Sequence, residues 1–145
     1  MDTMTATISS KEAIQLEDKL DELAINSLVD LIWSLGSFEY MDNKFMIKWV
    51  EVAQEKIQEF NYKDLVRIIW ALSTFTFRHP IFLRKWTQQA IKLLDDFSSN
   101  NLTLSIFSLA RLDFQEMDFF DKVIEKIKVM LDHLKFEEHY QLYLA

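Results

Sequence analysis

The sequence predicts an all-α fold: a right-handed α-solenoid of about three 37-residue helix-hairpin repeats, with half repeats at both ends. The first observation is a motif, Leu-x-x-x-Ile-aromatic-x-Leu, which occurs three times with its aromatic residue at Trp33, Trp70 and Phe107. Successive copies are 37 residues apart, which is in the range of helical-hairpin repeats. The second observation is that the 145 residues include one glycine and one proline, too few for the many special turns of a sandwich or barrel.

The same 37-residue register extends beyond the motif, which argues against chance amphipathic periodicity. Loops between helices reset the helical phase, so an accidental pattern would not stay in step across two of them. Each helix pair is expected to expose apolar surface on two sides, and neighbouring pairs cover that surface when they stack. The chain is therefore expected to form one array rather than separate domains.

The N-terminal part is expected to begin with a flexible tail, residues 1–9, followed by a half repeat over residues 10–23. Ser9 and Glu12 have the spacing of a capping box at the start of this helix. Its apolar stripe includes Leu16, Leu20 and Leu23, which align at 37-residue steps with the second helix of each later repeat. The chain is thus expected to start with a second helix.

Three full repeats follow, over residues 24–60, 61–97 and 98–134. Their first helices are expected to end near Phe38, Phe75 and Leu112. Their second helices are expected to start near Asp42, Pro80 and Asp118, and Pro80 suits a first helical position because no N–H partner is lost there. Residues 135–145 resemble a terminal half repeat, which either caps the array or marks a continuation.

Composition argues against an enzyme, a cofactor and a metal site. The chain has no cysteine, which excludes disulfides and thiolate sites, and Gly36 alone cannot build a phosphate-cradling loop. The histidines do not pair with carboxylates at a repeating ligand spacing. No apolar run is long enough to cross a bilayer, and no N-terminal targeting signal is seen. These features fit an intracellular reducing compartment, an organelle matrix or a bacterial cytoplasm.

The tryptophans are a candidate surface for stacking on nucleobases, but packing in the core is the favoured interpretation. Trp33 and Trp70 lie in mid-helix, each two residues before a leucine, and Phe107 occupies the equivalent position in the third copy of the motif. Trp49 and Trp86 align with Val123, an aliphatic residue, which also indicates packing. All four indole rings, and the ring of Phe107, are therefore expected in the seams between helices.

The pattern from Asp64 to Leu72, followed by Pro80, resembles the octotricopeptide repeat. It is also similar to the related repeats of FAST-kinase-like, RAP-associated proteins. The resemblance covers residues 26–145 and implies a non-catalytic α-solenoid that binds RNA during transcript processing, translation or ribosome assembly. The third repeat departs from the pattern with Phe107 in place of Trp, and the chain lacks the basic excess of an RNA-binding array.

A ladder of residues off the core face of the first helices is the candidate contact surface for RNA or a protein partner. Its members recur at spacings of three and four residues, which place each set on one stripe; they are Ser27, Asp30, Ser34, Ser37, Asp64, Arg67, Thr74, Asn101, Ser108 and Arg111. Such a stripe is equally expected of an unconstrained solvated face.

Two functions remain open from the sequence. One is an RNA-associated module that binds single-stranded RNA or joins a ribonucleoprotein. The other is a protein-interaction scaffold that binds a partner, or itself, through the terminal half repeat. The net charge of −7 argues against tight RNA binding by this chain alone, although residues 1–23 hold six acids and two lysines and so account for −4 of it.

Overall fold

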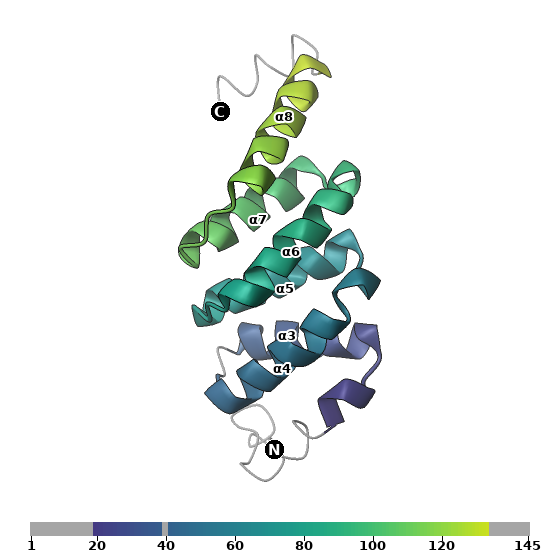
Figure 1. Cartoon of the computed structure of the whole chain (residues 1–145), viewed down its shortest axis with the longest axis vertical. Coiled ribbons are helices and arrows are strands. Elements are labelled where there is room, and N and C mark those ends of the chain that lie inside the picture. The colour runs from purple at the N-terminus through teal and green to yellow at the C-terminus, as the bar shows by residue number, and fades with distance from the viewer. Residues whose placement is uncertain (1–18, 39–40, 134–145) are drawn as a thin grey trace.

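The computed structural model describes residues 19–38 and 41–133, and all regular structure within these ranges is helical (Figure 1). The α-helices are α3 (Ile25–Ser37), α4 (Asn43–Glu55), α5 (Tyr62–Phe75), α6 (Pro80–Lys92), α7 (Ser99–Arg111) and α8 (Met117–His133). Of the short 3-10 helices, η1 (Leu20–Glu22) precedes α3, η2 (Ile57–Glu59) follows α4 and η3 (Leu94–Asp96) follows α6. The prediction of an all-α fold is confirmed.

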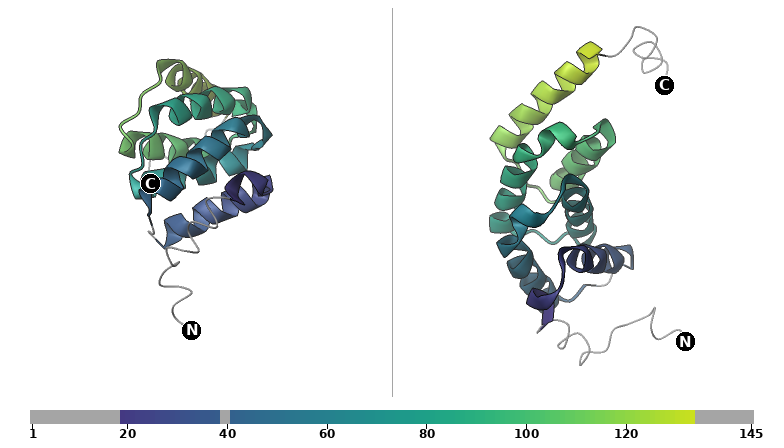
Figure 2. Two further views of the ribbon diagram at one scale, coloured as in Figure 1. Left: turned by 60° about the horizontal axis from the view of Figure 1, so that its bottom comes forward. Right: turned by 90° about the vertical axis from the view of Figure 1, so that its right-hand side faces the viewer.

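The helices form two layers, as the two views of Figure 2 show. The first layer contains α3, α5 and α7, and the second contains α4, α6 and α8. Helices of the first layer approach one another more closely than those of the second. The second layer therefore lies on the outer side of a gently bowed stack, and the first layer lies on its inner side.

The two layers are joined by a hydrogen bond that recurs after 37 residues. The buried indole Nε1 of Trp49 donates to the carbonyl oxygen of Leu28 at 3.1 Å. In the next hairpin, Nε1 of Trp86 donates to the carbonyl oxygen of Leu65 at 2.8 Å. Because both indoles are fully buried, each N–H needs such a partner, and the bond fixes a second helix on its own first helix.

The same indole rings also connect successive helices of the second layer. Trp49 meets Phe82 edge to face with a centroid distance of 6.4 Å, and Trp86 meets Phe119 in the same way at 5.8 Å. These arrangements are the favoured geometry for aromatic pairs. The predicted core role of Trp49 and Trp86 is therefore confirmed.

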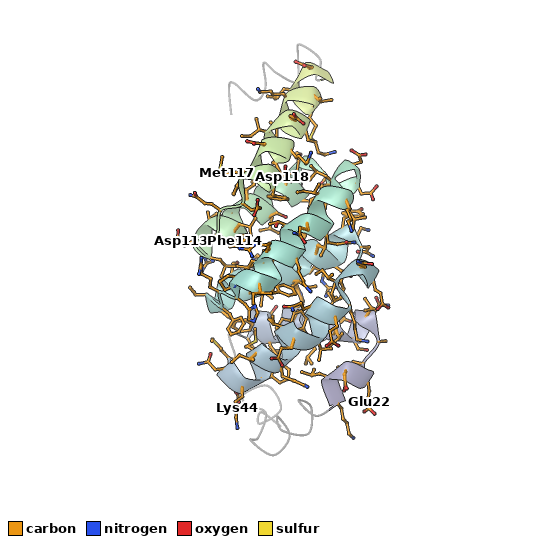
Figure 3. All side chains as sticks on the ribbon, in the orientation of Figure 1. Glu22, Lys44, Asp113, Phe114, Met117 and Asp118 are labelled. Carbon is orange, nitrogen blue, oxygen red and sulfur yellow. The ribbon has the colours of Figure 1, made fainter. Side chains whose placement is uncertain are left out.

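The turns recur at the same interval as the contacts. Thr76 and Asp113 both adopt left-handed backbone conformations, with φ of 54° and 52°. In each turn the following phenylalanine closes a helix end, because Phe77 N bonds to Leu72 O at 2.9 Å and the N–H of Phe114 bonds in the equivalent way. Figure 3 shows Asp113 and Phe114 in the turn that leads to α8.

Side chains cap the starts of two second-layer helices. Asp42 caps α4 by accepting from Phe45 N at 3.2 Å, and Pro80 occupies the first turn of α6 as expected. The cap of α6 is the side chain of His79, whose Nδ1 accepts from Phe82 N at 3.1 Å. Helix ends and starts lie within one or two residues of those predicted. The cap therefore gives His79 a structural role.

Several predicted segments lie outside the described residues. The tail over residues 1–9, most of the half repeat over 10–23 and the terminal half repeat over 135–145 are among them. Only Lys19 to Leu23 of the leading half repeat are described, and they include η1 with its buried Leu20. Within the described helices, none is long and apolar enough to cross a membrane.

The close approach of α3 and α5 depends on Gly36. A Cβ atom at Gly36 would lie 3.2 Å from Cβ of Ala71 and 3.4 Å from the ring of Trp70. These distances leave no room for a larger side chain. Small residues at such a crossing allow two helix backbones to approach below the usual separation of about 8–10 Å.

Replacing Gly36 with leucine is expected to lower the free energy of unfolding by about 1–3 kcal/mol, because the side chain would overpack the crossing with Ala71. Urea unfolding followed by circular dichroism measures the change. Ser37→Leu, at an exposed position on the same helix, is the control and should stay within about 0.5 kcal/mol of the parent. Equal stability of Gly36→Leu and the parent would contradict the close approach.

Candidate nucleic-acid interface

The first layer carries a row of aromatic rings, Trp33 on α3, Trp70 on α5 and Phe107 on α7, which we name the aromatic stripe. The rings of Trp33 and Trp70 lie against each other with a centroid distance of 4.6 Å and an interplanar angle of 39°. Both indoles are half-buried, whereas Phe107 is 56% exposed. The stripe thus presents ring surface to solvent.

The prediction that all three rings pack in the core is wrong for Phe107 and only partly right for the two tryptophans. The physical reason lies in the close crossing of the first-layer helices. With the ring of Trp70 against the place of Gly36, the crossing has room for small side chains but not for an indole. The two indoles therefore lie beside the crossing, partly packed and partly accessible. Phe107 lies on α7, the last first-layer helix among the described residues, so no later described helix of that layer covers its ring.

Two guanidinium groups accompany the aromatic stripe. Arg67 lies over Trp33 with its guanidinium carbon 5.2 Å from the ring centroid, and it forms an ion pair with Asp30 at 3.0 Å. Arg111 lies 5.8 Å from the ring centroid of Phe107, four residues along the same helix. Cations at these distances interact favourably with an aromatic face. The stripe therefore combines planar rings with groups that can bind phosphate.

Exposure varies along the polar ladder. The exposed members are Ser27, Asp30, Ser34, Ser37 and Arg111, and the half-buried members are Arg67, Thr74 and Asn101. The hydroxyls of Ser37 and Thr74 both donate to the backbone carbonyl oxygen four residues earlier, at 3.0 Å each. This equivalent bonding keeps those hydroxyls against their own helices, although their oxygen atoms can still accept.

Asp64 and Asn101 have local structural roles at helix starts. Asp64 accepts from the backbone N–H of Asn61 at 3.0 Å, and Asn101 accepts from that of Ser98 at 3.1 Å. Each completes a capping box, the reciprocal pair of bonds that satisfies the first N–H groups of a helix. Asp64 is also buried, so its side chain is not displayed with the rest of the ladder.

The predicted surface position of Ser108 is wrong, because its side chain is fully buried. The register explains the error. Ser34, Ala71 and Ser108 are equivalent positions, but only Ser34 is exposed. The other two are buried because α5 and α7 each pack on a preceding first-layer helix. A position that faces water on α3 is therefore covered on the later helices.

Basic residues are concentrated on one helix of the second layer, which was not predicted from the sequence. Along the ladder, Asp30 and Asp64 offset Arg67 and Arg111. On the second layer, α6 carries Arg84, Lys85 and Lys92 and has no acidic residue between Pro80 and Lys92. The charge of each helix taken separately was the signal that would have revealed this basic helix.

No group of three or more histidine, cysteine, aspartate or glutamate side chains is placed to hold a metal ion in residues 19–38 and 41–133. His79 serves as a helix cap. The chemistry available along the aromatic stripe is therefore stacking, cation–π contact and hydrogen bonding.

The chain matches a family model described as RNA-editing substrate-binding complex 6 protein over residues 2–137, nearly its whole length, and it belongs to that family. No curated protein matches the chain. The family name refers to a complex that binds RNA-editing substrates, which confirms the predicted RNA-associated role at the level of the family. The relation to octotricopeptide repeats stays a prediction.

Replacing Asp64 with alanine is expected to lower the free energy of unfolding by about 1 kcal/mol, because the N–H of Asn61 loses its partner. Thermal or urea unfolding measures the loss. Ser27→Ala, at the equivalent exposed position of α3, should leave stability within about 0.5 kcal/mol. If Asp64→Ala leaves stability unchanged, the capping role assigned to this carboxylate is wrong.

Proposed function

We propose that this chain is a non-catalytic, RNA-associated subunit whose first layer contacts single-stranded RNA within a larger complex. Family membership supports the RNA association. The observation that carries the placement is the aromatic stripe with Arg67 and Arg111 beside its rings. Single-stranded RNA is commonly bound by surfaces that combine stacking rings with basic side chains.

The expected affinity of the isolated chain is modest. Phosphate contacts normally supply much of the binding free energy, and the stripe offers two guanidinium groups. Two phosphate contacts correspond to a slope of about −1.4 in the logarithm of the association constant against the logarithm of salt concentration. Binding should therefore depend only shallowly on salt, and the rest of the complex would supply further affinity.

We also propose the finer architecture that the sequence predicts: a right-handed array over residues 10–145 preceded by a tail over 1–9. The hairpins 24–60, 61–97 and 98–134 would be its full repeats, with half repeats over 10–23 and 135–145. The recurring indole–carbonyl bonds of Trp49 and Trp86 support this division. An octotricopeptide-like origin would account for the period and the position of Pro80.

Replacing Arg67 and Arg111 together with alanine is expected to weaken binding to a fluorescent single-stranded RNA about tenfold or more at low salt, because two charge-assisted contacts are lost. Fluorescence anisotropy over a range of salt concentrations measures the affinity and its slope, which should become shallower.

The matched control is Arg84→Ala with Lys85→Ala, which removes the same charge from the exposed side of α6 on the second layer. This variant should bind RNA within about twofold of the parent. A loss that is confined to the α6 variant would overturn the proposed placement on the first layer. The absence of any binding at low salt would overturn direct RNA contact.

A protein-interaction scaffold is the second candidate function, and exposed apolar residues on α8 favour it. Ile124, Val129 and Leu131 are 50%, 54% and 42% exposed. Two of these positions have buried equivalents earlier in the chain. Val50 is the equivalent of Ile124, and Leu94 is the equivalent of Leu131. An exposed apolar face of this kind is typical of a surface that another protein covers.

If α8 mediates self-association, light scattering of the parent chain should show an oligomer whose mass falls to that of a monomer at low concentration. Ile124→Lys with Val129→Lys should be monomeric throughout, because two charges would be placed in the contact. Lys128→Ala, also exposed on α8, is the control and should keep the oligomer. A strictly monomeric parent would contradict self-association.

A further inference from the structure

We infer that the aromatic stripe binds unpaired nucleobases by stacking, with the ring of Phe107 as its most open platform. This inference rests on the proposed RNA association and specifies what the first layer recognises. It differs from the polar ladder, in which side chains at the surface would read base edges by hydrogen bonding. The following contacts carry it.

Phe107 is the most exposed ring of the aromatic stripe. Its side chain is 56% exposed, whereas Trp49 and Trp86 are fully buried. A planar partner that covers the exposed ring would remove its apolar surface from water, which is favourable. A nucleobase presents a planar π-face of suitable size, and stacking on aromatic side chains is a principal way in which proteins bind single strands.

The basic group beside the ring favours a nucleic acid over an apolar protein segment. Arg111 is exposed and lies four residues after Phe107, so the two side chains share one face of α7. A base stacked on the ring would place its phosphate within reach of the guanidinium. A purely apolar partner would leave that charge without a counterion.

The row continues across the layer through Trp70 and Trp33. Their rings are in contact at a centroid distance of 4.6 Å, and Arg67 covers part of Trp33 while bound to Asp30. A strand running along the layer would therefore meet a ring on each successive helix. Guanidinium groups also stack on bases, so Arg67 extends the same surface rather than interrupting it.

Stacking of this kind selects single strands and tolerates different sequences. Bases of a duplex are paired and stacked on one another, so their faces are closed to the protein. Every base has a π-face, which makes stacking largely independent of sequence. The stripe should thus bind single-stranded homopolymers of different bases with similar affinities and bind duplex RNA weakly.

The four tryptophans provide a direct test. Trp49 and Trp86 are buried and hydrogen-bonded, so RNA should leave their fluorescence unchanged, whereas the half-buried Trp33 and Trp70 should be quenched by stacked bases. Titration of the intact chain with single-stranded poly(U) and poly(A) should quench part of the emission. Bound RNA should also protect that part from acrylamide.

Trp33→Phe with Trp70→Phe keeps aromatic rings but removes the reporters, so the RNA-induced quenching should disappear while anisotropy still detects binding. Phe107→Ala should weaken binding about 5- to 150-fold, which corresponds to the ~1–3 kcal/mol of one stacked base. Phe107→Tyr should retain most of the affinity. Ile81→Ala, an exposed apolar position on α6, is the control for loss of surface area and should bind like the parent.

The outcomes separate this inference from the proposed function. If RNA binds without quenching and Phe107→Ala binds like the parent, stacking is overturned while RNA association through the polar ladder stands. If no single-stranded RNA binds at low salt, both proposals fail. Equal affinity for duplex and single-stranded RNA would overturn the selection of unpaired bases.

Discussion

The close crossing of the first-layer helices is the constraint on which the rest of the structure depends. Gly36 lets the backbone of α3 approach α5 at Ala71, and the small, buried Ser73 and Ser108 occupy the corresponding places one repeat later. The second-layer helices have larger facing side chains, including Trp49 and Trp86, and lie further apart. Unequal spacing of two layers bows the stack, because each hairpin is rotated slightly against the last.

The same crossing determines where the aromatic side chains go. Large rings are accommodated in the second layer, where each buried indole finds both a ring partner and a carbonyl acceptor. In the first layer the crossing of α3 and α5 at Gly36 and Ala71 excludes them, so Trp33 and Trp70 lie beside it, and Phe107 occupies the equivalent position on α7. A packing requirement of the fold thereby produces a row of accessible rings.

The sequence predicted the parts of the structure that depend on chain-local signals. The 37-residue register, together with Asp42 and Pro80, placed the predicted helix boundaries within one or two residues of those observed. It predicted exposure less well, because exposure depends on which neighbours surround a helix. Ser34 and Ser108 have the same residue type and register, yet one is exposed and the other buried. Positions that are 37 residues apart thus point in equivalent directions, but the sequence register does not tell whether a neighbouring helix is there to cover them.

The distribution of charge explains how an acidic chain can still serve an RNA-associated complex. Net charge governs long-range attraction, whereas stacking acts at contact and does not require a basic surface. Two guanidinium groups beside the rings, at Arg67 and Arg111, act locally on phosphates that are already close. Such an interface would capture RNA slowly on its own, because little electrostatic steering assists the encounter. It would act efficiently on RNA that other subunits have already brought to it, which is the setting that membership of this family implies.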